Sequence, residues 1–236
     1  MIAALADAGA LLGERRYLDA ATQAADFVWE RMRDAGGRLL RSFNHGEARL
    51  PAYLEDHAFL LEALLTLNEA GFEERFFERA RALAEEILAR FCDEHRGGFY
   101  VTAADSRPLI TRRKDLEDTP IPSGSSSAAL GLLRLAALTG ERRYEDAAAG
   151  AIGLAAPLAA RYPLAFGHLL TALDLRTAGA REIAIVGPDA AQLLAVVRER
   201  HRPHVVLAAN DGASVSAVPL LEGRTAAGGR ATAYVC

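Results

Sequence analysis

The sequence predicts a mostly α-helical protein that forms part of an (α/α)6 toroid of helical hairpins and ends in a small α/β tail. Three observations support this fold class. A short segment recurs along the chain, apolar helices alternate with half-charged ones, and strand-like runs replace the helical pattern after residue 180. With 236 residues, 51% of them apolar, the chain can bury a sizeable core.

The recurring segment is clearest in two copies. "LLGERRYLDAA" at 11–21 returns as "LTGERRYEDAA" at 138–148, and "FEERFFERA" at 72–80 is a weaker copy. Glycine pairs open extended runs at 36–43 and 97–102. The repeating unit is therefore expected to be a helix, a short turn, a second helix and a glycine-opened extended segment.

The predicted helices alternate in character. Four are apolar nearly all round and three have one charged face, which is typical of an inner ring wrapped by an outer ring. An ordinary helical solenoid is the alternative. The apolar helices are 2–12, 57–70, 125–139 and 164–178, and the half-charged helices are 17–34, 74–92 and 142–160. Six closed hairpins would need more helices than these seven, so the chain is expected to be a piece of a larger toroid.

The tail reads as a strand, a helix and further strands. The expected elements are 182–187, 188–201, 204–208 and a last strand within 230–236. We therefore expect a partial toroid at 1–180 and a βαβ appendage at 181–236. The turn after the first strand is Gly-Pro-Asp instead of G-x-G-x-x-G, which favours a packing appendage over a dinucleotide site.

Composition excludes some classes of function. A net charge of −4 gives no electrostatic reason to bind nucleic acid or an anionic membrane. Cys92 and Cys236 have no metal-like spacing, so we expect no metal, no cofactor and a reduced, cytoplasmic protein. The apolar N-terminus lacks a basic segment and a cleavage pattern, and it is too short to span a bilayer. The excess of arginine and alanine is typical of a GC-rich bacterial genome.

Several stretches resemble one family. "YLEDHAFLLEALL", "GGFYVTAADSRPLITRRKDLEDTPIPSGSSSAALGLL", "AIVGP" and the terminal "TAYVC" resemble the YyaL-like, thioredoxin-domain-containing proteins related to spermatogenesis-associated protein. The resemblance covers the chain in order. It implies a six-hairpin toroid similar to those of glycosidases and N-acylglucosamine epimerases, preceded in the family by a thioredoxin-like domain. This chain would correspond to the C-terminal part, without that domain.

Two positions depart from the family pattern. Ser125 stands where an asparagine is usual after Pro-Ser-Gly, and Arg113 stands where a proline is common. Losing the amide removes a side chain that can both donate and accept hydrogen bonds. The first departure weakens a ligand-binding role for this loop.

Two loops are the candidate site. The loops at 50–59 and 119–128 lead into apolar inner helices, whose N-termini would face a common cavity in a toroid. The free N–H groups and partial positive charge of helix N-termini suit hydroxyl or anionic ligands. We therefore expect a sugar or another polyol as the ligand there.

Glu55, Asp56 and His57 are the candidate catalytic residues of the first loop. Glu55 and Asp56 would act as an acid–base pair on a sugar, with Asp105 or Asp118 as a partner across the bond. The alternative is that Asp56 caps the helix and Glu55 offsets its dipole. His57, and less so His168, would be an acid–base residue as in epimerase-type toroids, or a hydrogen-bonded core histidine.

The remaining candidates would bind substrate. Ser123 or Ser125 caps the second inner helix and Gly124 allows a tight entry, but three small hydroxyls also leave room for a ligand. No G-x-S-x-G motif supports a serine nucleophile. Tyr53 would stack on a sugar, and Lys114 would bring positive charge to the rim unless it is an ordinary surface charge.

The sequence leaves two functions open. The first is carbohydrate binding or catalysis in a longer parent protein. The second is a non-catalytic scaffold that supports the thioredoxin-like domain or another protein partner. A dinucleotide enzyme that uses the tail ranks last, and whether the chain is an enzyme stays open.

Overall fold

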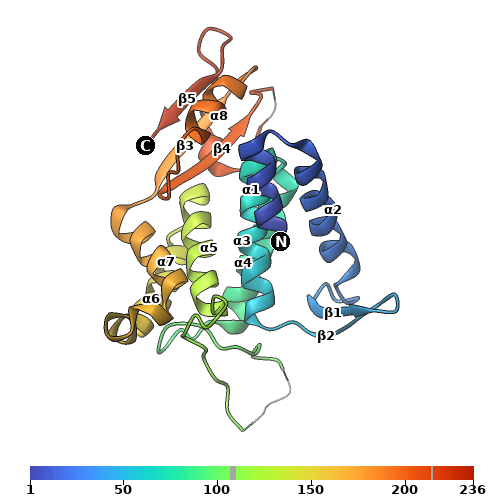
Figure 1. Cartoon of the computed structure of the whole chain (residues 1–236), viewed down its shortest axis with the longest axis vertical. Helices are drawn as coiled ribbons and strands as arrows, with labels where there is room; N and C mark the ends of the chain where they lie inside the picture. The colour runs from blue at the N-terminus through green and yellow to red at the C-terminus, as the bar shows by residue number, and fades with distance from the viewer. Residues whose placement is uncertain (107–109, 214) are drawn as a thin grey trace.

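The computed structural model describes residues 1–106, 110–213 and 215–236. Helical hairpins make up most of it, and a small α/β unit lies at one end (Figure 1). All seven predicted helices are present: α1 Ile2–Leu12, α2 Arg15–Arg31, α3 Leu54–Gly71, α4 Glu74–Phe91, α5 Gly124–Thr139, α6 Arg142–Arg161 and α7 Gly167–Ala178. A 3-10 turn, η1, covers Pro163–Ala165.

Inner and outer helices follow the predicted alternation. Helices α1, α3, α5 and α7 pack in sequence order against one another, and α2, α4 and α6 each pack on the inner helix of their own hairpin. The helix α3 is buried over ten of its eighteen residues, since inner helices are covered on most sides. Across the described ranges, none of these helices has both the length and the apolar character needed to cross a bilayer.

The three hairpin turns share one backbone conformation. The residue that follows each inner helix is left-handed: Gly13 with φ 68°, Phe72 with φ 55° and Gly140 with φ 73°. These positions are equivalent in the sequence repeat. A left-handed residue ends a helix by turning its N–H back to the last carbonyl groups, and glycine does so without steric cost. The repeat therefore encodes the turn as well as the helices.

Several bounds differ from the sequence prediction. Helix α2 ends at Arg31 instead of residue 34, and α7 begins at Gly167 instead of residue 164. Helix α3 begins at Leu54, because the Asp56 carboxylate at its third position accepts the Tyr53 N–H at 2.8 Å. Helix α8, Ala191–Arg198, is shorter than the predicted 188–201. The run 97–102 is not a strand: Gly97 and Gly98 have φ near +72°, and only an isolated bridge from Cys92 to Phe99 forms.

Strands occur in two places. After α2, β1 Leu40–Asn44 pairs antiparallel with β2 Glu47–Pro51. In the tail, the sheet order is β4-β3-β5, with β3 Arg181–Val186 parallel to β4 Val205–Asn210 and antiparallel to β5 Thr232–Val235. Helix α8 connects the parallel pair, so the small α/β tail is confirmed. A second 3-10 turn, η2, covers Pro219–Leu221.

The tail joins the helical part through its own alternating pattern. One face of the sheet, with Ala184, Val186 and Val206, belongs to the same apolar core as α3 and α5. The other face, with Ile183 and Ile185, lies under α8. Because the sheet and the helices share one core, the division into two domains at residue 180 stays a prediction.

Helices α3 and α5 approach each other closely at two glycines. A Cβ built on Gly124 would lie 2.9 Å from the backbone nitrogen of Glu55, and one on Gly131 would lie 2.8 Å from Leu61 Cδ2. Backbone cannot move aside as a flexible side chain can, so the first contact is the stricter one. The start of α5 therefore rests directly on the start of α3.

Replacing Gly124 by alanine is expected to destabilise the protein by about 1–3 kcal/mol, since overpacking against backbone forces the helices apart. Gly153 is the matched control, because it is an exposed glycine within α6 with nothing near its missing Cβ. There, alanine should stabilise by up to about 1 kcal/mol through helix propensity. Urea unfolding of both variants is the measurement, and equal effects would contradict the contact.

Candidate functional site

The first predicted loop forms a charged cluster at the start of α3. The Glu55 carboxylate lies 3.1 Å from the Arg41 guanidinium, and Arg41 also covers the Tyr53 ring at 4.5 Å. Glu55 and Tyr53 are both partly exposed. Asp56 accepts the Tyr53 N–H, which is the capping role that the sequence left open. Glu55 and Tyr53 therefore remain open to a ligand, whereas Asp56 already has a structural partner.

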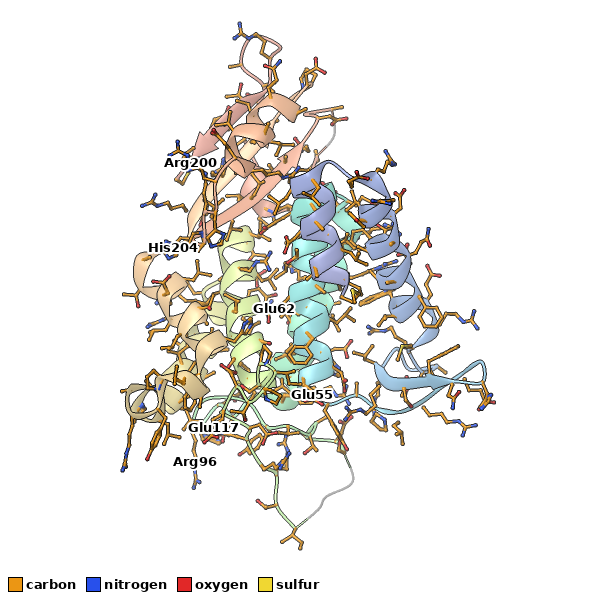
Figure 2. All side chains as sticks on the ribbon, viewed as in Figure 1. Glu55, Glu62, Arg96, Glu117, Arg200 and His204 are labelled. Carbon is orange, nitrogen blue, oxygen red and sulfur yellow. The ribbon has the colours of Figure 1, made fainter. Side chains whose placement is uncertain are left out.

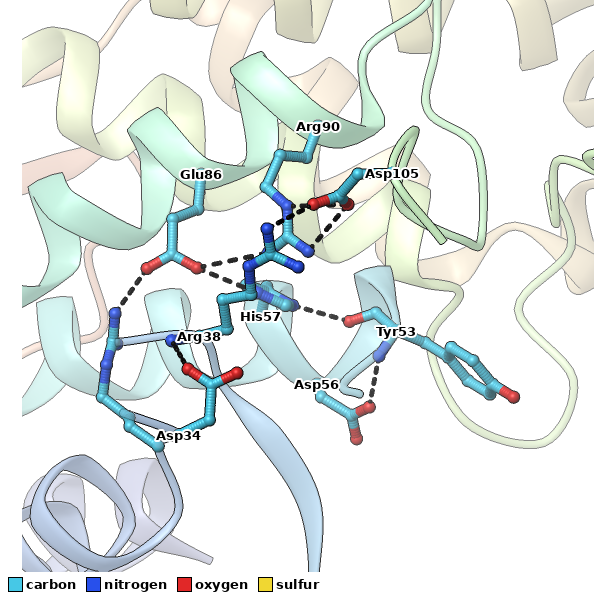
Figure 3. A network of polar contacts seen from close by, with 9 residues as sticks. Asp34, Arg38, Tyr53, Asp56, His57, Glu86, Arg90 and Asp105 are labelled. Carbon is cyan, nitrogen blue, oxygen red and sulfur yellow. Dashed lines mark hydrogen bonds and ion pairs between the residues drawn. The ribbon is translucent and has the colours of Figure 1, made fainter. Parts of the chain in front are cut away.

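His57 is fully buried and belongs to a polar network whose other members are partly exposed (Figure 3). Its Nδ1 is 2.8 Å from the Tyr53 carbonyl oxygen, and its Nε2 is 3.3 Å from Glu86. Burial raises the pKa of Glu86, but His57 and Arg33 beside it lower this pKa more, so the carboxyl stays ionised. Since a substrate cannot reach a fully buried imidazole, we leave His57 out of the site proposed below.

The second predicted loop forms the start of α5. Ser123 is the N-cap, and its hydroxyl accepts the Ser126 N–H at 3.0 Å. The hydroxyls of Ser125 and Ser127 are buried and have no hydrogen-bond partner among the residues that the structure describes. Gly124 contacts Glu55, so the two predicted loops do meet, but they meet by packing backbone on backbone.

Asp118 ties the starts of two inner helices together. Its carboxylate accepts the Ser123 N–H at 2.8 Å, ahead of α5, and the His168 and Leu169 N–H groups at 2.9 and 3.1 Å, in the first turn of α7. An anionic acceptor at a helix N-terminus satisfies donors that have no partner within the helix. Asp118 was predicted as a substrate contact, and the structure gives it this positioning role.

Lys114 lies away from the start of α5. Its amine is 2.7 Å from Asp93 and also bonds the Gly97 carbonyl oxygen. Lys114 and the Tyr100 hydroxyl hold the pKa of Asp93 well below its usual range. The amine therefore anchors the loop after α4, and its predicted contact with a ligand stays a prediction. Asp105 is likewise paired, with Arg90 at 3.0 Å.

A histidine–carboxylate pair lies on the inner side of the helices. His168 Nε2 of α7 is 2.9 Å from the Glu62 carboxylate of α3, and both side chains are partly exposed, at 25% and 17%. Figure 2 shows Glu62 between α3 and α5, above Glu55 on the same helix. The hydrogen bond to Glu62 raises the pKa of His168 against the effect of burial. The pair can therefore hold a proton near neutral pH.

A charged cavity begins about one helical turn beyond this pair, where Thr66 and Thr171 line it. Arg134 of α5 is 3.1 Å from the Thr66 hydroxyl and 3.2 Å from Glu69, both on α3. These residues, with Asp7 and Thr171, line a cavity of about 690 Å³. Burial raises the pKa of Glu69 and of Asp7, while Arg134 opposes both shifts. We call the seven residues together the inner-face site: Asp7, Glu62, Thr66, Glu69, Arg134, His168 and Thr171.

The inner-face site suits a ligand with many hydroxyl groups. Carboxylates accept hydrogen bonds from hydroxyls, guanidinium donates to them, and threonine does both. No hydrogen bond from His168 Nδ1 occurs within residues 1–106, 110–213 and 215–236, so that nitrogen can donate or accept at a ligand. Among the same residues, no group of three or more histidine, cysteine or acidic side chains is placed to hold a metal ion.

The sequence analysis named His168 but not its partner. The missed signal is the spacing of Glu62, Thr66 and Glu69, which puts three polar residues on one side of the largely apolar stretch 58–70. Arg134 is a similar exception on α5. Polar residues at helical spacing on an inner helix point to the interior of the ring.

Comparison with known proteins relates the chain to longer proteins, although no family model matches it. It is 31% identical over 254 residues to human "Spermatogenesis-associated protein 20", and 31% identical over 253 residues to the rat protein. These alignments cover all of the chain and 32% of each relative, so the chain spans about a third of their length. Both relatives are mammalian, and the expected bacterial origin stays a prediction.

Comparison with solved structures shows the fold. Cellobiose 2-epimerase from Bacillus thermoamylovorans matches with a TM-score of 0.53 and 16% identity, over 65% of this chain and 41% of that one. Unsaturated glucuronyl hydrolase from Bacillus sp. GL1 matches with a TM-score of 0.51 and 18% identity, over 65% and 43%. Both are α/α toroids, so the predicted partial toroid is confirmed.

Replacing Asp118 by alanine should destabilise the protein by about 2–3 kcal/mol, because three backbone N–H groups lose a charged acceptor. Asp118→Asn keeps one acceptor oxygen and should recover part of the loss. Glu117→Ala is the control, since this neighbour is exposed and should change stability by less than about 0.5 kcal/mol. Urea unfolding distinguishes them, and equal effects at 117 and 118 would rule out the tie.

Replacing Glu62 by glutamine should lower the pKa of His168 toward its ordinary value of about 6.5. The pKa of His168 is higher in the folded protein than in the unfolded chain. The pair therefore stabilises the folded state fully below the unfolded pKa of His168, and this stabilisation is lost as the pH rises through its folded pKa. Glu62→Gln should therefore cost more stability at about pH 6 than at about pH 9. NMR titration of His168, with exposed Glu78→Gln as control, is the measurement; an unchanged pKa would disprove the coupling.

Proposed function

The chain is a homologue of spermatogenesis-associated protein 20, and from this relationship and its toroid fold we propose that the inner-face site binds a carbohydrate or another polyol. The single observation that carries the proposal is the Glu62–His168 pair. Its two side chains come from different inner helices, are partly exposed and lie 2.9 Å apart, about one helical turn from the Thr66 and Thr171 that line a charged cavity.

The fold supports the choice of ligand. The two solved toroids are named for reactions on sugars, cellobiose epimerisation and glucuronyl hydrolysis. Fold alone does not carry activity over to another chain, so the proposal rests on the residues of the site. A pocket lined by carboxylates, several arginines and two threonines offers the donors and acceptors that a polyol needs.

The pair also supplies acid–base chemistry. The raised pKa of His168 favours its protonated form, and Glu62 holds the imidazole through Nε2. Nδ1 is then the atom that gives a proton to a ligand oxygen or takes one from a ligand carbon or hydroxyl. Glu69 and Asp7, with raised pKa values, are the groups placed to hydrogen-bond the rest of the ligand.

Binding is tested by thermal unfolding of the chain with glucose, N-acetylglucosamine, cellobiose, glucuronate and inositol. A ligand of the folded state raises the midpoint as its concentration exceeds Kd. The shift should disappear in Glu62→Gln and His168→Asn. His204→Asn is the matched control, because His204 and Asp174 form a similar pair at 2.7 Å that is not part of the inner-face site. If no polyol shifts the midpoint, or if all three variants behave alike, the proposal fails.

A second candidate function is a non-catalytic scaffold for a thioredoxin-like domain or another protein. Exposed apolar side chains favour it: Leu11 and Leu12 at the end of α1 are 64% and 69% exposed, and Leu164 in η1 is fully exposed. Large exposed apolar residues at an edge are typical of surfaces that another protein covers. This function predicts that no polyol binds and that Leu11→Ser with Leu12→Ser weakens the partner interaction instead.

A further inference from the structure

Three outer helices begin with the same structure. Each starts at a glutamate N-cap, followed two residues later by arginine and then by an aromatic residue; the segments are Glu14–Tyr17, Glu73–Phe76 and Glu141–Tyr144. The arginine Nε lies 3.3, 2.8 and 2.7 Å from the N-cap carboxylate. Its guanidinium stands 4.8, 4.5 and 4.8 Å from the following ring centre. We call this structure the docking turn.

Two of the three docking turns bind the preceding outer helix. Arg75 donates to Asp26 of α2 at 2.9 and 3.0 Å, and Arg143 donates to Glu85 of α4 at 2.7 and 2.6 Å. Asp26 and Glu85 each lie twelve residues after the N-cap glutamate of their own helix. Neighbouring outer helices therefore use one fixed register, in which the arginine of a docking turn meets the acid at position twelve of the helix before it.

The docking turn at Arg16 has the same local structure as the other two but is more exposed to solvent. The Arg16 side chain is 71% exposed, against 41% for Arg75 and 49% for Arg143. Tyr17 is only half-buried, whereas Phe76 and Tyr144 are at most 1% exposed. Within the described ranges, no carboxylate from another helix reaches Arg16. The turn thus has the local structure of a docked copy without its partner.

The apolar residue beside this turn is uncovered too. Leu11 precedes Glu14 by three residues, as Leu138 precedes Glu141. Leu138 is fully buried, but Leu11 is 64% exposed. One edge of the protein, made by the end of α1 and the start of α2, therefore presents a cation, an aromatic ring and an apolar side chain together.

A second copy of this chain does not supply the missing carboxylate. Asp26 and Glu85 are already bound by Arg75 and Arg143. The equivalent position in α6 is Gly153, which has no side chain to offer. The open surface fits a different helical hairpin.

We propose that the surface formed by Leu11, Arg16 and Tyr17 docks a further helical hairpin of the same repeat, whose outer helix carries an aspartate or glutamate twelve residues after its N-cap. The carboxylate would bind Arg16 as Asp26 binds Arg75. The hairpin would also cover Leu11 and bury the ring of Tyr17. The three charges at the turn, Glu14, Arg16 and the new acid, match those at the two docked turns.

The first test compares the three arginines in the chain as it stands. Arg75→Gln and Arg143→Gln remove an interhelical ion pair, whereas Arg16→Gln removes none. Exposed pairs of this kind change the unfolding equilibrium constant by about two- to five-fold. We expect that loss for Arg75 and Arg143 and no loss for Arg16. An equal loss of stability in Arg16→Gln, or no loss in any of the three variants, would contradict the proposed pairing between the arginine of a docking turn and the acid of the preceding outer helix.

The second test adds a hairpin with a known acid. A copy of residues 54–91, followed by a copy of 32–53 as the natural connection to an inner helix, is placed before Met1. The copied Glu85 should then meet Arg16. In this extended chain Arg16→Glu should destabilise, and Glu85→Arg in the copy should restore stability at least two-fold in the unfolding constant.

The control for the second test is Glu78→Arg in the copy, which lies about two helical turns before Glu85 and should restore nothing. Quenching of Tyr17 fluorescence by iodide is the independent readout, compared with a Tyr17→Phe variant to isolate its signal. Burial of Tyr17 on adding the hairpin agrees with docking. If the added hairpin leaves Tyr17 as exposed as before, or if Glu78→Arg restores stability equally well, the proposed surface is wrong.

Discussion

The close approach of α3 and α5 fixes the geometry of the interior. At Gly124 the two helices touch backbone to backbone, and at Gly131 a leucine side chain of α3 fills the space of the missing Cβ. Two contacts seven residues apart set both the distance and the register of the pair. Arg134, one turn beyond Gly131, is thereby placed between Thr66 and Glu69.

The third inner helix is placed from the same starting point. Asp118 accepts N–H groups at the beginning of α5 and in the first turn of α7. It therefore fixes the N-terminus of α7 relative to the N-terminus of α5. His168 lies at that end of α7, and its ring consequently meets Glu62 of α3. The acid–base pair therefore depends on Asp118, which accepts the backbone N–H of His168 while the imidazole bonds Glu62.

Much of the fold was predictable because the information is local. Apolar periodicity, the repeated Gly-Glu-Arg-Arg-Tyr segment and the alternating tail gave seven helices and a small α/β unit. The errors in the predicted elements also have local causes. The run at 97–102 has strand-like residues, but two glycines at positive φ bend it, and α3 starts early because a carboxylate at its third position caps it. Asp56 is a predicted cap, but the predicted helix start at residue 57 lies about one turn after the observed start at Leu54.

The site was harder to predict, because it depends on which residues of different helices lie at the same height along the packed helix axes. The sequence placed the loops at Glu55 and Ser123 together correctly, yet it had no means to see that Lys114 is held by Asp93 or that His57 is enclosed. Glu62 and His168 are 106 residues apart in the chain, and their contact follows only from the register of α3, α5 and α7.

The outer helices hold neighbouring hairpins together, and the inner helices carry the polar groups of the interior. Ion pairs such as Arg143 with Glu85 hold neighbouring hairpins together at the outer surface, where partly exposed charges need little compensation. The inner helices are freed from that role. They carry few charges, and each buried charge there must be offset by another, as Arg134 offsets Glu69. Retaining such groups in an apolar interior costs stability, which is the reason to expect that they serve a ligand.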